Sequence, residues 1–173
     1  MKALSLWQPW ASAIALGAKR IETRGWCTLY RGPLAIHAAK RCVKSELYDL
    51  LEDERWMGAL DRPIYDCTPW TWLPFGSIVA VARLTSCLGV ELFRAEDLDE
   101  RRSPSWAGDH SHDWCERRSP TWACDHSHDW CERDMGDFCP GRFGWVLTDV
   151  RAVKPIPWRG AQGLFDVPDE LVR

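Results

Sequence analysis

The sequence predicts an α+β fold in a single domain. Several segments show the two-residue alternation of β-strands, and two short segments show the three-and-four spacing of a helix. The chain has 173 residues, an ordinary length for one domain, and its 46% hydrophobic content is ample for one core. We therefore expect a single domain over residues 1–173, with an inserted duplicated loop at about 101–132.

The first quarter of the chain predicts a strand, a short helix and a second strand. Residues 3–7 alternate as a first strand. Pro9 suits the first turn of a helix, where its missing N–H would have no partner, and Gly17 suits a left-handed stop. We expect a helix over residues 9–16. Beyond it, residues 19–24 alternate as a strand with at least one polar face.

The remaining elements follow in chain order. Alternation predicts strands at 34–39, 76–87 and 143–153, with the last strand closing the sheet. Leucines at helical spacing predict a helix over residues 44–56. Proline and tryptophan favour a packed loop at 57–75, and the Pro- and Gly-rich tail should be irregular apart from an extended piece at 163–167.

An internal repeat interrupts this pattern. Residues 101–116, RRSPSWAGDHSHDWCE, recur as 117–132, RRSPTWACDHSHDWCE. So exact a tandem copy favours an insertion in a tolerant surface loop. The alternative is a zinc site, because the repeat supplies imidazole and thiolate ligands, although it lacks paired C-x-x-C motifs. The candidate ligands are His110, His112, Cys115, Cys124, His126, His128 and Cys131.

Charge is distributed unevenly along the chain. Residues 1–45 hold eight Lys or Arg and one acidic residue, whereas residues 91–139 carry a net charge of −7. A basic segment of this kind favours an anionic partner, most simply a phosphate. The alternative is a solvated face whose charge the acidic segment offsets in three dimensions.

A motif at the helix-to-strand corner carries a family resemblance. Gly17, Lys19, Glu22 and Arg24 form G-x-K-x-x-E-x-R, with WQPWAS before it, GWCTLYRGPLAIHAAK after it and RGAQGLFDVP near the end of the chain. Together these segments resemble ASCH domains of the PUA-like superfamily. The resemblance implies a small PUA-like β-barrel flanked by short helices, with the motif lining a cleft suited to RNA or a nucleotide.

The first functional hypothesis is RNA or nucleotide binding by a basic cleft. Cationic side chains would hold phosphates while indole rings stack a base. The candidate phosphate contacts are Lys19, Arg24, Arg31 and Lys40, and the candidate stacking residues are Trp7, Trp10 and Trp26. His37 could bond a substrate or be a structural histidine. The resemblance adds Arg159 and Gln162 in the tail as further candidates for ligand contact.

The alternative is a hydrolase acting on a modified nucleoside or on RNA. Lys19 and Glu22 would form an acid/base or water-positioning pair, and Arg24 would stabilise developing negative charge. The chain also resembles small bacterial 4-acetylcytidine amidohydrolases, which carry Lys, Thr and Arg at the matching positions. Here Glu22 stands at the threonine position, which removes the proposed hydroxyl nucleophile. Thr23 is adjacent, but alternation along a strand would turn it to the opposite face.

Composition also bounds the cellular setting. Eight cysteines in a chain of this size, with no secretory leader, favour a reduced protein of the cytoplasm over a disulfide framework. Apolar runs are far shorter than about 18 residues, so we expect no membrane span. No cofactor other than the alternative zinc is expected.

Overall fold

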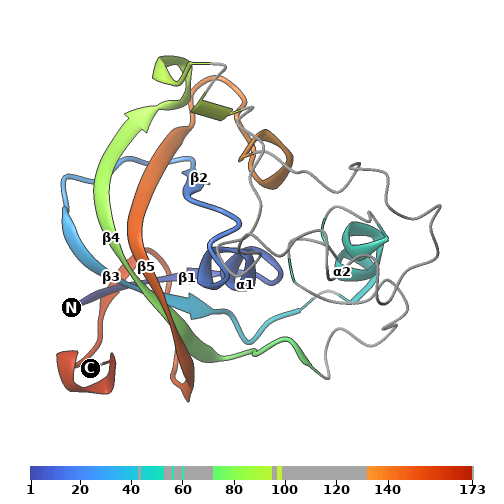
Figure 1. The fold of residues 1–173 in the computed structure, drawn as a ribbon, viewed down its shortest axis with the longest axis vertical. Coiled ribbons are helices and arrows are strands. Elements are labelled where there is room, and N and C mark those ends of the chain that lie inside the picture. Colours follow the sequence, from blue (N-terminus) through green and yellow to red (C-terminus); the bar gives the residue numbers. More distant parts are fainter. Residues whose placement is uncertain are drawn as a thin grey trace, which may run out of the picture.

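A single mixed β-sheet organises the molecule. The computed structural model describes residues 1–42, 44–52, 56, 60, 72–94, 97–98 and 132–172. Six strands in the order β2-β5-β4-β3-β1-β6 form one sheet. The sheet curls into a half-barrel with a few short helices beside it, which is the predicted α+β fold (Figure 1). All of the candidate zinc ligands lie outside the described residues. The last residue of the repeat, Glu132, is described, and the rest of the repeat is not.

The observed elements lie close to the predicted ones. The strands are β1 (Lys2–Leu6), β2 (Ile21–Arg24), β3 (Gly32–Ala38), β4 (Ser77–Gly89), β5 (Phe143–Pro157) and β6 (Leu164–Asp166). The α-helices are α1 (Trp10–Ala15) and α2 (Lys44–Leu51), and short 3₁₀ helices are η1 (Val90–Leu92), η2 (Glu132–Met135) and η3 (Asp169–Val172). All of the predicted strands and both helices are confirmed, with shifted ends. The sequence pattern did not indicate the 3₁₀ helices.

Parallel pairing of β1 with β3 places the carboxyl-terminal ends of both strands at the same end of the sheet. The register runs from Lys2 opposite Leu34 to Leu6 opposite Ala38, so both strands end together. The backbone N–H of Ala39 then donates to the carbonyl of Leu6 at 2.7 Å. The residues that follow β1 and β3 therefore emerge side by side.

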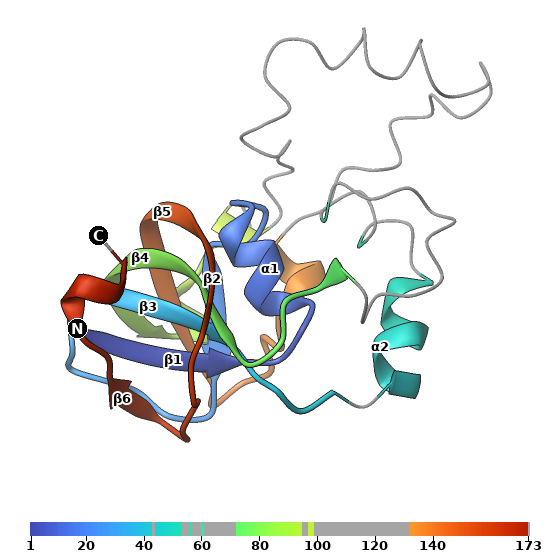
Figure 2. The same cartoon turned by 90° about the horizontal axis from the view of Figure 1, so that it is seen from below.

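Helix α1 lies in the concave face of the half-barrel (Figure 2). Ala11 and Ile14 of this helix pack with strand residues such as Leu34 and Trp145, all of them fully buried. The helix ends as predicted, because Gly17 has a positive φ of 78° and its N–H donates to the carbonyl of Ile14. The chain turns there and enters β2.

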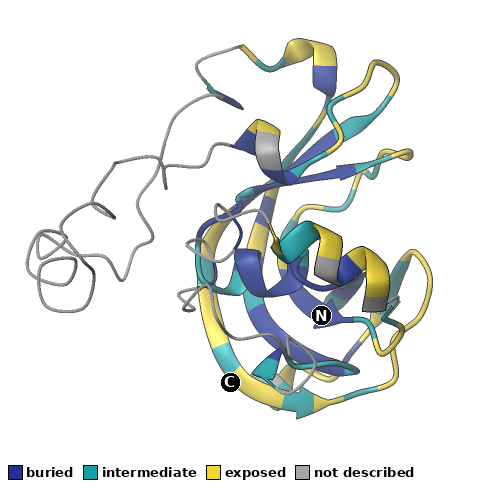
Figure 3. Cartoon of the chain, turned by 90° about the vertical axis from the view of Figure 1, so that its right-hand side faces the viewer, coloured by how far each residue is buried: buried dark blue, intermediate teal, exposed yellow. Residues whose placement is uncertain are grey.

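Burial follows the curl of the sheet. The inner faces of the strands are buried, whereas the carboxyl-terminal half of β5 is largely exposed (Figure 3). Strand β2 lies at one end of the sheet and pairs with β5 alone among the described strands. β5 therefore lies between β2 and β4, and the sheet is an open half-barrel. No helix in the described part of the chain is long and apolar enough to cross a membrane.

Candidate functional site

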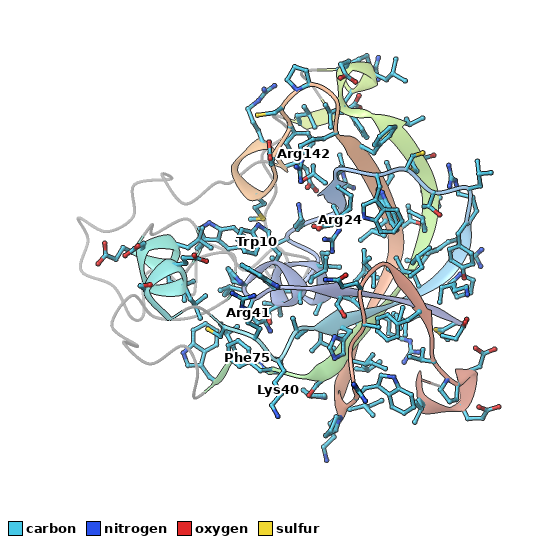
Figure 4. All side chains as sticks on the ribbon, turned by 180° about the vertical axis from the view of Figure 1, so that it is seen from behind. Trp10, Arg24, Lys40, Arg41, Phe75 and Arg142 are labelled. Atoms are coloured by element: carbon cyan, nitrogen blue, oxygen red, sulfur yellow. The ribbon has the colours of Figure 1, made fainter. Side chains whose placement is uncertain are left out.

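A cavity of about 450 Å³ opens beside β2, at the predicted helix-to-strand corner. We call it the signature cavity. Its lining comes from the end of β1, the start of α1, β2, and the segment 135–142 that leads into β5 (Figure 4). The lining residues are Ser5, Leu6, Trp7, Trp10, Glu22, Thr23, Arg24, Leu50, Trp56, Met135, Gly136, Asp137 and Arg142.

One wall of the signature cavity is polar. Arg24 Nε lies 3.3 Å from Glu22 Oε1, and an Arg24 terminal nitrogen donates to the carbonyl of Ser5 at 2.7 Å. Arg142 Nη1 lies 3.3 Å from Asp137 Oδ2. Hydrogen bonds from Cys139 lower the pKa of Asp137, which keeps this carboxylate charged. The ionisable lining residues are thus two arginines and two carboxylates.

Another part of the lining is aromatic. Trp7 follows β1 and is 46% exposed, whereas Trp10 opens α1 and is partly buried. Trp10 meets Trp56 edge-to-face, with ring centroids 5.8 Å apart and an interplanar angle of 81°. Indole rings held in this way present flat apolar surfaces with little freedom to move. The cavity therefore combines stacking surfaces with hydrogen-bonding groups of both signs.

Lys19 lies behind the polar wall rather than in it. Its side chain is fully buried, and its ammonium donates to the carbonyls of Ile21, at 2.5 Å, and Met135, at 2.8 Å. It also lies 3.7 Å from Glu22 Oε2. Lys19 and Met135 are 116 residues apart in the chain, so this one ammonium joins β2 to the end of η2. Through these contacts Lys19 holds the polar wall of the cavity in position.

Glu132 completes the same buried cluster. Its carboxylate accepts hydrogen bonds from the backbone N–H groups of Arg20, at 2.6 Å, and Ile21, at 3.1 Å. Burial raises the pKa of Glu132, whereas the charge of Lys19 and the two amide donors oppose that rise. Two sets of hydrogen bonds thus connect residues 132–135 to the start of β2. Glu132 accepts from the backbone of Arg20 and Ile21, and Lys19 donates to the carbonyl of Met135.

Comparison with known proteins places this geometry in a family. The ASCH domain family model matches residues 4–157, which is most of the chain. The chain belongs to the ASCH domain family. The resemblance noted in the sequence is therefore confirmed.

Individual relatives match more narrowly. Human and mouse activating signal cointegrator 1 are each 33% identical over 94 residues, which is 54% of this chain and 15% of those proteins. This ASCH chain therefore spans a small part of the curated relatives that it matches. The crystal structure of ASCH from Zymomonas mobilis has a TM-score of 0.46 at 15% identity, covering 98% of this chain and 88% of that one. A mutant form of that protein gives 0.46 at 16% identity, with 98% and 91% covered.

The structure brings together only some of the predicted site residues of this ASCH domain. Trp7, Trp10, Glu22 and Arg24 line the signature cavity, and Lys19 lies directly behind it. Trp26 packs edge-to-face on Trp145, with centroids 4.6 Å apart, and does not line the cavity.

The other candidates lie outside the signature cavity. His37 is buried and bonds Ser5 Oγ and the Trp158 carbonyl, both at 3.0 Å, which fits the structural alternative. Arg31 is exposed and donates to the carbonyls of Thr28 and Tyr30. Lys40, Arg159 and Gln162 are exposed and do not line the cavity.

Thr23 corrects one expectation. Alternation predicted that it would face away from Glu22, yet it also contributes to the cavity lining. The reason is that the segment after η2 folds over the end of the sheet, and the N–H of Asp137 donates to Thr23 Oγ1 at 3.0 Å. The Thr23 hydroxyl is therefore engaged with the backbone of the opposite segment.

Several residues that build the cavity had no signal in the sequence. Asp137 and Arg142 come from the segment between the repeat and β5, for which the sequence predicted no helix or strand, and Glu132 ends a repeat that was expected to lie in a tolerant loop. Residues more than a hundred positions from the motif complete the site through backbone contacts. A pattern confined to one segment cannot indicate such contacts. Among the described residues, no three His, Cys, Asp or Glu side chains gather as a metal site.

Proposed function

We propose that this ASCH domain binds a nucleotide unit of RNA in the signature cavity. The observation that supports this is one cavity lined by indole rings together with arginines and carboxylates. Its volume of about 450 Å³ is in the range of small-ligand pockets, about 300–1,000 Å³. The base would stack on Trp7 or Trp10, with its edge toward Arg24 and Arg142.

The charges of the lining determine which part of the nucleotide enters. Arginine forks and carboxylates recognise the donor and acceptor edges of bases, whereas a phosphate needs an excess of positive charge. Here Glu22 accompanies Arg24, and Asp137 accompanies Arg142. The cavity interior therefore suits a base, and the phosphate would lie at its rim. The lining is thus balanced in charge, unlike the basic cleft expected from the sequence.

The hydrolase alternative has less support from the same contacts. Lys19 is fully buried and its ammonium donates to two carbonyl oxygens, so it does not reach a ligand in the cavity. Glu22 faces Lys19 with one oxygen and Arg24 with the other. Incubation with N4-acetylcytidine tests this alternative, and turnover lost in Glu22→Gln would favour it over binding alone.

Matched tryptophan variants test the binding proposal. We expect the full chain to bind a labelled single-stranded RNA pool, with Trp7→Ala losing about 1–3 kcal/mol of binding free energy, as for one stacked base. Trp26→Ala is the control, because Trp26 is also exposed (37%) but lies outside the cavity. Fluorescence anisotropy at several salt concentrations measures both variants. Binding to no RNA pool, or equal losses in the two variants, would refute the proposal.

A further inference from the structure

A second, smaller hollow of about 100 Å³ lies next to the signature cavity. We call it the flanking hollow. Trp7, Trp10 and Leu50 line both spaces, so Trp7 and Trp10 form a shared partition. Arg41 lies over the indole of Trp7, with its guanidinium carbon 5.7 Å from the ring centroid. Figure 4 shows Arg41 beside Trp10, with Lys40 beyond it and with Arg24 and Arg142 on the other side.

The sheet topology places Arg41 there. Because β1 and β3 run parallel and end together, the chain leaving β1 at Trp7 meets the chain leaving β3 at residues 40–41. The hydrogen bond from Ala39 N–H to the Leu6 carbonyl fixes this junction. Gly76 leaves room for the aliphatic stem of Lys40, since a Cβ at Gly76 would come within 3.4 Å of the Lys40 Cβ. The two cations therefore project from a defined corner of the sheet.

The cations at this corner differ from the arginines of the cavity in their ion pairing. Arg24 and Arg142 each face a carboxylate at 3.3 Å, whereas neither Lys40 nor Arg41 has an ion-pair partner in the described part of the chain. Both are exposed. Glu46 also lines the flanking hollow and is the one carboxylate there among the described residues. A guanidinium without a carboxylate partner, on the far side of a stacking ring, is well suited to a phosphate.

We propose that the flanking hollow is a phosphate subsite for the nucleotide next to the one in the signature cavity. The inference rests on the proposed function and deepens it, because it names the ligand class. The ligand is then an unpaired strand of at least two nucleotides, with one base in the cavity and the neighbouring phosphodiester at Arg41. A free mononucleotide would fill only the cavity.

The competing explanation is that Arg41 only packs on Trp7. A cation–π contact at an exposed site is a modest interaction, and its loss would affect Trp7 and the cavity in the same way for every ligand. A phosphate contact has a different consequence. It would add affinity only for a ligand long enough to reach past Trp7, and that added affinity would depend on salt.

The experiment compares ligands of two lengths on the full chain. The probes are the four nucleoside monophosphates and six-nucleotide single-stranded pools of RNA and of DNA. We expect Arg41→Gln to weaken hexamer binding about tenfold, as for one charge-assisted contact, and to leave mononucleotide binding unchanged. The slope of log affinity against log salt should fall by about 0.7 for the hexamer. Loss with both RNA and DNA indicates the shared phosphodiester chemistry, and loss with RNA alone indicates an RNA strand.

Two further variants make the result decisive. Glu46→Gln removes the carboxylate from the same hollow, so it should strengthen hexamer binding, which a packing defect would not do. Lys154→Ala removes one exposed positive charge on β5 that lines neither space, and it should change hexamer affinity less than twofold.

The two proposals fail in different ways. If Trp7→Ala weakens binding as expected but Arg41→Gln leaves hexamer affinity unchanged, or weakens both ligand lengths equally, the phosphate subsite is wrong and the cavity proposal stands. Binding of no probe by the unaltered chain overturns both.

Discussion

Lys19 is the residue on which the geometry of the site depends most. It is fully buried, and among the described residues its ammonium contacts acceptor oxygens on Ile21, Met135 and Glu22. Removing one partner from a buried polar cluster leaves the others without compensation, which is costly. Lys19 therefore shapes the cavity through the segments that it holds together.

We expect Lys19→Met to destabilise the fold by about 3–5 kcal/mol, as for a buried charge partner. Urea denaturation measures this change. Lys154→Ala is the control, because Lys154 is exposed and should change the unfolding free energy by about 0.5 kcal/mol or less. A Lys19→Met protein as stable as the unaltered chain would show that the buried cluster contributes nothing to folding.

Glu132 predicts a pH dependence. Burial raises its pKa above the ordinary value of 4.5, so the folded protein holds the proton more tightly than the unfolded chain does. The contribution of Glu132 to stability is therefore complete below pH 4.5 and declines as the pH rises through the raised pKa. We expect the unfolding free energy of the unaltered chain, relative to Glu132→Gln, to fall over that range.

Denaturation of both proteins at a series of pH values from about 4.5 to 8 tests this. His37 has a pKa lowered by burial and contributes the opposite slope on acidification, but it is present in both proteins and cancels in the difference. Parallel stability curves would mean that Glu132 titrates alike in the folded and unfolded chain.

At the scale of elements, the stop of α1 sets the direction of β2. Gly17 has a φ of 78°, which side chains with a Cβ adopt only with strain. We expect Gly17→Ala to lower the unfolding free energy by about 1–2 kcal/mol. Gly25→Ala is the matched control, because a Cβ there meets nothing within 4 Å and Gly25 is not among the glycines with positive φ. Thermal denaturation of the pair should show a lower midpoint for Gly17→Ala alone.

At the scale of the whole molecule, one copy of the repeat should be dispensable. Deleting 101–116 or 117–132 gives nearly the same chain, since the copies differ only at Ser105/Thr121 and Gly108/Cys124. Either product keeps a glutamate followed by RDMGD, so the bonds of Glu132 to β2 can form. We expect both deletions to retain RNA affinity and to change stability by about 0.6 kcal/mol or less, because closure entropy varies slowly with loop length.

Circular dichroism, urea denaturation and anisotropy on the two deletions provide the measurement. Loss of folding in both would show that the second copy is required. A difference between them would trace to one of the two positions at which the copies differ, Ser105/Thr121 or Gly108/Cys124.

The sequence was sufficient for the fold and for part of the site. Strand alternation and the Pro9 and Gly17 signals predicted the strands and α1, and the motif located the cavity. The role of Lys19 could not be predicted, because its partners are backbone carbonyls, one of them 116 residues away. The same holds for Asp137 and Arg142, which reach the cavity only because the chain after η2 folds over β2.

One buried ammonium joins two distant segments that both line the cavity. The stability of the fold should therefore report whether the cavity is occupied. A compound that contacts both β2 and residues 135–142 binds the folded chain and not the unfolded one, so at a fixed concentration it raises the melting temperature by an amount that grows with the logarithm of its affinity. A thermal-shift screen of natural and modified nucleosides can therefore find the preferred base without any assumption about the chemistry that follows binding.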